Sequence, residues 1–125
     1  MTPIATQNAP AAIGPYSQAI AHGGMVWCSG QVALDPAGGG MIGDDAATQA
    51  VQCLRNLSAV LAAAGSSLQH AVKVTIFLAD MNDFAEVNAV YSDAMGEHRP
   101  ARACVEVARL PKDALVEIDC VAVAG

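Results

Sequence analysis

The chain has 125 residues, and its 12 acidic and 6 basic side chains give a formal net charge of −6. Hydrophobic residues make up 54% of the chain and charged residues only 14%, whereas an average soluble domain has about 25% charged residues. The length predicts one domain over residues 1–125, and the apolar composition excludes a disordered chain. So little charge indicates a neutral surface or a surface buried against other subunits.

Several further classes of protein are excluded or disfavoured. The longest purely apolar run, 59–64, is far below the ~20 residues of a membrane span. The N-terminus has neither a basic start nor an apolar segment, so we predict no signal peptide and a cytoplasmic protein. The negative net charge disfavours a nucleic-acid partner, because that binding depends on clustered Lys and Arg.

Four cysteines stand at 28, 53, 104 and 120, without a Cys-x-x-Cys pair and without a histidine at ligand spacing. A zinc site would need such clustering, so no metal is expected. Free thiols in a reducing compartment are the preferred interpretation.

The first third of the chain predicts a hairpin. After an irregular lead-in over residues 1–16, extended runs over 17–21 and 25–29 flank a glycine turn. A third short strand is expected over 31–34, before a glycine-rich loop.

A helix should follow, because apolar residues recur at helical spacing from Asp44 onwards. Asp44 or Asp45 is placed to cap its first turn, and Gly65 to end it. A second helix ends at Gly96, and its start has a capping-box pattern between Asp83 and Glu86. The remaining strands are expected over 72–79, 101–109 and 115–124.

This order of elements predicts an α+β fold with a mixed sheet. Two helices cannot cover both faces of a five- or six-stranded sheet, but they can cover one. The other face must meet solvent or another subunit, and the low charge favours a subunit.

The last two predicted strands each carry a charged side chain of interest, the basic Arg102 and the acidic Glu117. Side chains alternate between the faces of a strand, so Arg102 shares a face with Cys104, near the start of one strand, and Glu117 lies near the start of the next. If these strands are antiparallel neighbours, the two residues lie toward opposite ends of the pair. They would then meet more easily across a subunit boundary than within one chain. Without further information, a surface ion pair is the ordinary interpretation.

Motifs along nearly the whole chain favour a functional role for Arg102 and Glu117 over a surface ion pair. They are NAPAAIGPYSQA at 8–19, SGQ at 29–31, NDF at 82–84 and PARACVEVARLPKD at 100–113, with Glu117 following. In this order they resemble the RidA/YjgF family of reactive-intermediate deaminases.

The resemblance implies a chorismate-mutase-like α+β subunit that assembles as a homotrimer with clefts between subunits. It implies hydrolysis of small 2-imino acids, such as 2-iminopropanoate and 2-iminobutanoate, to 2-keto acids and ammonia. Such imines are released by PLP-dependent dehydratases. The resemblance implies neither a metal nor an organic cofactor. The short apolar runs of the sequence predict no membrane partner.

The resemblance also implies roles for individual residues. Arg102 would grip the substrate carboxylate, which a guanidinium fork matches better than an ammonium does. Glu117 would position or activate the attacking water. Cys104 is expected to line the pocket rather than attack, because no histidine base is paired with it. The expected substrate-binding residues are Tyr16, Ser29, Asn88, Ala103 and Cys104.

The chain departs from the family pattern near the motif at 100–113. Only Glu97, His98 and Arg99 stand between Gly96 and Pro100, where family members often have a longer stretch. Ala103 follows Arg102, where serine or threonine is common. These departures concern the lip of the cleft and the range of imine side chains that it accepts.

Two other functions stay as alternatives. A non-catalytic trimeric binder of small carboxylates or 2-keto acids would need Arg102 but not Glu117, because a second negative charge weakens carboxylate binding. RNA cleavage, which has been attached to some relatives, fits the net charge of −6 least well.

Overall fold

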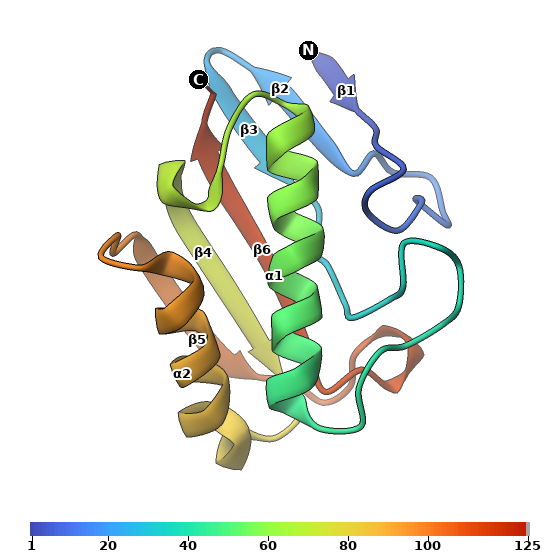
Figure 1. Cartoon of the computed structure of the whole chain (residues 1–125), viewed down its shortest axis with the longest axis vertical. Coiled ribbons are helices and arrows are strands. Elements are labelled where there is room, and N and C mark those ends of the chain that lie inside the picture. Colours follow the sequence, from blue (N-terminus) through green and yellow to red (C-terminus); the bar gives the residue numbers. More distant parts are fainter. Residues whose placement is uncertain (125) are drawn as a thin grey trace.

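A six-stranded mixed sheet carries both helices on one of its faces (Figure 1). This computed structural model describes residues 1–124. The strands lie in the order β1-β2-β3-β6-β4-β5, and only β4 and β5 are parallel neighbours. The predicted α+β class, with two helices on one face, is confirmed. The elements are β1 (Thr2–Ile4), β2 (Ala19–His22), β3 (Met25–Cys28), α1 (Ala46–Ala63), β4 (Ala71–Leu78), α2 (Phe84–Met95), β5 (Ala101–Glu106) and β6 (Val116–Val123).

Helix α1 begins and ends where the sequence indicates. The Asp45 carboxylate accepts a hydrogen bond of 2.7 Å from the backbone N–H of Thr48, so Asp45 is the cap. Gly65 follows the helix with a φ of 75°, a left-handed conformation that glycine adopts without strain.

The capping box predicted for α2 is wrong. Asp83 has helical backbone angles, and its side chain makes no capping hydrogen bond. The chain enters α2 through a 3-10 turn over Met81–Asp83, so the capping position moves back to Asp80. The Asp80 carboxylate accepts from the N–H of Asn82 at 2.9 Å.

The predicted strand over 31–34 is also wrong, because that segment makes only isolated bridges, from Gln31 to Ile118 and from Leu34 to Met41. The physical reason is Asn56, a fully buried residue of α1. Its side-chain amide donates to the carbonyl oxygens of Val32 at 3.2 Å and Leu34 at 3.1 Å. These carbonyls therefore bond to a helix side chain instead of a neighbouring strand.

At the N-terminus, the irregular lead-in expected over residues 1–16 contains the short strand β1, which pairs with β2. As an edge strand it tolerates Pro3, which has no N–H to donate.

The strands β5 and β6 are not neighbours, so the pairing considered for Arg102 and Glu117 is wrong. Strand β4 lies between them, parallel to β5 and antiparallel to β6. Strand β5 also ends at Glu106 rather than Arg109.

The core lies between the sheet and the helices. No helix among residues 1–124 is long and apolar enough to cross a membrane. On the face without helices, large apolar side chains are exposed: Trp27 by 53%, Val123 by 44% and Val105 by 41%. Burying such side chains stabilises an assembly by about 25 cal/mol per Å², so this face is suited to contact with another subunit.

Candidate functional site

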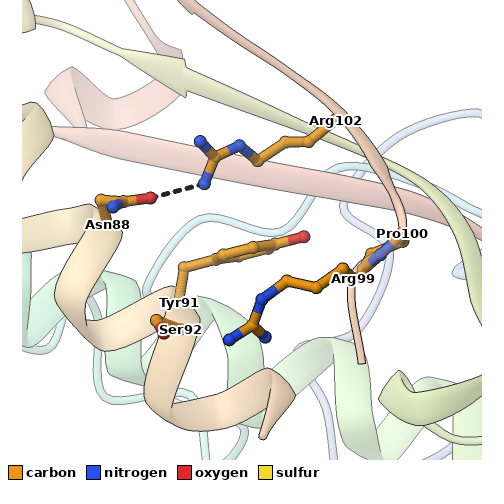
Figure 2. Close-up of a pocket in the computed structure, with 6 residues that line it drawn as sticks. All are labelled: Asn88, Tyr91, Ser92, Arg99, Pro100 and Arg102. Atoms are coloured by element: carbon orange, nitrogen blue, oxygen red, sulfur yellow. Dashed lines mark hydrogen bonds between the residues drawn. The ribbon is translucent and has the colours of Figure 1, made fainter. Parts of the chain in front are cut away.

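Arg102 lies in a cavity of about 400 Å³ between α2 and the start of β5 (Figure 2). Its Nη1 donates to the Oδ1 of Asn88 at 2.6 Å. The guanidinium carbon lies 5.0 Å from the centroid of the Tyr91 ring, within the range of a cation–π contact. These contacts orient the guanidinium and leave further N–H donors for a ligand. The cavity is lined by Asn88, Tyr91, Ser92, Arg99, Pro100 and Arg102.

No carboxylate neutralises this cavity. Within residues 1–124, the only ion pair shorter than 4.0 Å is Arg109 with Asp113, on the surface. Tyr91 is only 5% exposed, and its hydroxyl has no hydrogen-bond partner. Burial raises the pKa of Tyr91, although the neighbouring Arg102 and Arg99 act to lower it. The phenol therefore stays protonated and can donate a hydrogen bond to an anion.

Glu117 belongs to a second cavity, of about 410 Å³. Burial raises the pKa of this half-buried carboxyl group, and the negative charge of Asp119 raises it further. A raised pKa makes a carboxylate a better proton acceptor near neutral pH. The cavity is lined by Ile13, Tyr16, Ser29, Gly30, Val32, Leu34, Pro111, Lys112 and Glu117.

Gly30 allows the Glu117 carboxylate to lie directly against the backbone. A Cβ atom at position 30 would overlap Oε2 of Glu117 and lie 2.9 Å from its Cδ. The absence of a side chain at Gly30 therefore makes room for the carboxylate at this position. Gly30 has no predicted role of its own, although it belongs to the SGQ motif at 29–31.

Tyr16 and Ser29 are positioned by a loop that Gln18 holds in place. The Gln18 side chain accepts from the N–H of Thr6 at 2.7 Å and donates to the carbonyl of Pro10 at 2.7 Å. The Ser29 hydroxyl donates to the carbonyl of Ser17 at 2.6 Å. Tyr16 is half exposed at the wall of the cavity.

Ala103 and Cys104 lie on β5 beside Arg102, and neither is among the residues that line the two cavities. Their register partners in β4 are Thr75 and Ile76. Burial raises the pKa of the Cys104 thiol, while Arg102 acts to lower it. A raised pKa keeps the thiol protonated, unlike the thiolate of a nucleophilic cysteine.

The two cavities are on opposite faces of the sheet. Arg102 pairs with Val74 and Glu117 pairs with Phe77, on the two sides of β4. These partners are three positions apart, so their side chains point to opposite faces and their backbones lie about 10 Å apart along the strand. Arg102 contacts α2, whereas Glu117 is on the face without helices. One chain therefore does not bring Arg102 and Glu117 together around a small molecule.

As to metal ligands, the described residues contain no group of three or more His, Cys, Asp or Glu side chains that could hold an ion.

The class of protein follows from comparison with known sequences. The sequence profile of the Endoribonuclease L-PSP family matches residues 6–124, and the chain belongs to this family, which is the RidA/YjgF family.

Named relatives are similar over nearly their whole length. A 2-iminobutanoate/2-iminopropanoate deaminase from Salmonella typhimurium is 52% identical over 123 residues, which cover 96% of this chain and 95% of that protein. A RutC family protein from Synechocystis sp. is 57% identical over 122 residues, covering 96% of this chain and 94% of that protein. The crystal structure of E. coli TdcF with bound serine matches with a TM-score of 0.94 at 45% identity, covering 100% of both chains.

Proposed function

We propose that this protein hydrolyses small 2-imino acids, such as 2-iminopropanoate and 2-iminobutanoate, to 2-keto acids and ammonia. The observation that carries the proposal is the pair of complementary cavities, one with an arginine that no carboxylate neutralises and one with a carboxylate of raised pKa. The site is completed when a second copy of the chain brings the two cavities together in a homotrimer.

Arg102 binds the substrate carboxylate in this proposal. Its planar fork can make two parallel hydrogen bonds to the two carboxylate oxygens. The hydrogen bond that Arg102 donates to Asn88 and the contact with the ring of Tyr91 hold that fork in one orientation before substrate arrives. Backbone groups around Ala103 and Cys104 are next to Arg102 and meet the same end of the substrate.

Glu117 activates the attacking water. It accepts a proton from water as the water oxygen bonds to the imine carbon, and it passes that proton to the nitrogen to give a neutral carbinolamine. Glu117 then transfers the proton of the carbinolamine hydroxyl to the nitrogen. The C–N bond then breaks, ammonia leaves, and the C=O bond of the keto acid forms, so one water is consumed for each ammonia released. The Tyr16 hydroxyl and Ser29 support the water or the nitrogen from the cavity wall.

The homotrimer explains the separation of the two cavities. In a closed ring each subunit presents one surface to the previous subunit and a different surface to the next. One surface carries Arg102 and the other carries Glu117, so each contact between subunits holds one complete site. The exposed Trp27, Val105 and Val123 supply apolar surface for such contacts.

The relatives support the same chemistry. The Salmonella relative is named for deamination of 2-iminobutanoate and 2-iminopropanoate, and the TdcF structure holds serine, a small amino acid with a carboxylate. We further propose that the chain acts as a single domain over residues 1–125. It would act in the cytoplasm on imines released by PLP enzymes.

The competing function is a trimeric binder of small carboxylates without turnover. Imine hydrolysis coupled to a PLP-dependent threonine dehydratase distinguishes the two, with semicarbazide to report the free imine. We expect wild type to lower the trapped imine, and Glu117→Gln to lose hydrolysis by the ~10²–10⁴-fold typical of a missing general base. Glu86→Gln, an exposed site on α2, is the matched control. A wild type that binds 2-ketobutyrate in calorimetry without hydrolysing any imine would establish the binder instead.

A further inference from the structure

Arg99 provides a second positive charge in the cavity of Arg102. Both arginines line the same space of about 400 Å³. Figure 2 shows the side chain of Tyr91 lying between the side chains of Arg102 and Arg99. With the phenol ring between them, each guanidinium group can bind a carboxylate of its own.

The position of Arg99 follows from the short connection between α2 and β5. Gly96 ends α2 with a φ of 62°, and Pro100 stands only four residues further along the chain. Within this turn, Nη1 of Arg99 donates to the carbonyl oxygens of Gly96 at 2.6 Å and His98 at 2.9 Å. These two bonds anchor one end of the guanidinium, which leaves Nε and Nη2 as donors for another partner.

Arg99 is exposed and has no carboxylate partner within residues 1–124. Among the described residues, no carboxylate lies within 4.0 Å of either arginine in this cavity. Tyr91, which is 5% exposed, presents a hydroxyl without a hydrogen-bond partner in the same place. Two guanidinium groups and an unpaired phenol hydroxyl are hydrogen-bond donors in a cavity whose lining contains no carboxylate. One monocarboxylate on Arg102 would leave Arg99 unpaired.

We infer that Arg99 is a specificity-determining residue that selects 2-imino acids with a second carboxylate in the side chain. This inference rests on the proposed function. Arg102 takes the carboxylate next to the imine, and Arg99 takes the side-chain carboxylate on the other side of Tyr91. Imines with short apolar side chains are still hydrolysed, but they leave the second charge of the cavity unused.

The test compares two imines on three proteins. An amino-acid oxidase acting on glutamate supplies the dicarboxylic imine, and threonine dehydratase supplies 2-iminobutanoate. Arg99→Gln should lower kcat/KM for the dicarboxylic imine about 10- to 100-fold more than for 2-iminobutanoate, as expected for a lost hydrogen bond to a charged group. The matched control is Arg55→Gln, which removes an equal charge from an exposed position on α1 and should not change the ratio. If Arg99→Gln lowers both rates equally, Arg99 only supports the turn, and the inference is wrong.

A second measurement separates failure of this inference from failure of the proposed function. A wild type that hydrolyses neither imine overturns the proposed function. Calorimetry then tests Arg99 on its own, with 2-ketoglutarate and 2-ketobutyrate as probes. We expect wild type to bind 2-ketoglutarate about tenfold more tightly and Arg99→Gln to lose that preference. Equal affinity of wild type for the two keto acids would overturn the inference, and this comparison needs no variant to fold.

Discussion

If Arg102 and Glu117 act from different subunits, two inactive variants should restore each other. Arg102→Ala removes the carboxylate-binding group but keeps Glu117, and Glu117→Gln does the reverse. Each variant alone forms trimers in which every site lacks one group. A mixed trimer contains contacts to which one subunit contributes an intact Arg102 and its neighbour an intact Glu117.

The size of the recovery follows from the separation of the two residues. They are on opposite faces of the sheet, with partners three residues apart along β4, so no subunit repairs its own site. In a ring assembled at random from equal amounts, each site draws its Arg102 and its Glu117 independently. About a quarter of the sites then receive both intact residues, so the mixture should recover about a quarter of wild-type activity.

The assay is the coupled imine assay, applied after the two variants have been denatured together and refolded. Native mass spectrometry verifies that mixed trimers have formed. The control mixes Arg102→Ala with the double variant Arg102→Ala/Glu117→Gln, a combination in which no contact has an intact Arg102. Mixed trimers with no more activity than this control would show that both residues act within one chain, or that one of them is not catalytic.

Three further changes probe the cavity of Glu117 and its neighbours. Gly30→Ala should displace the Glu117 carboxylate and lower imine hydrolysis at least tenfold. The free energy of unfolding should change by only about 1 kcal/mol, because the new Cβ overlaps the end of a flexible side chain. Unchanged activity would contradict this prediction. Asp119→Asn removes a negative charge that raises the pKa of Glu117, so that pKa should fall. Since the base must be deprotonated, the acid limb of the pH profile of kcat/KM should move to lower pH, and a stationary limb would count against Glu117 as the base. Cys104→Ser should keep activity within about twofold, because a thiol of raised pKa is no nucleophile. A loss of activity above tenfold would indicate that the thiol takes part in catalysis.

Local patterns predicted the elements well because the forces that form them act over a few residues. The spacing of apolar residues and the Asp45 cap located α1, and the glycine turn located the hairpin of β2 and β3. The strand expected over 31–34 failed because its carbonyls bond to Asn56, a residue more than 20 positions away. No local pattern reports such a contact.

The arrangement of the site was harder to predict than its residues. Motif resemblance predicts Arg102 and Glu117 as catalytic residues, but which strand lies between β5 and β6 depends on long-range packing. Tyr91 is a buried residue of α2, as the helical spacing of apolar residues in this segment indicates. The same spacing could not indicate that its hydroxyl lies unpaired between two arginines, because that follows from how the turn before Pro100 folds back.

Gly30 and Glu117 share one small volume, and this has a consequence for the history of the family. The space that a Cβ would need at position 30 is filled by the end of the side chain at position 117. As long as a lineage keeps a glutamate at 117, selection should reject every larger residue at 30. A lineage that replaces the glutamate with a shorter side chain vacates that space, and alanine or serine can then become fixed at position 30. We therefore expect the two positions to covary in an alignment of relatives, although they are 87 positions apart in the chain (117 − 30).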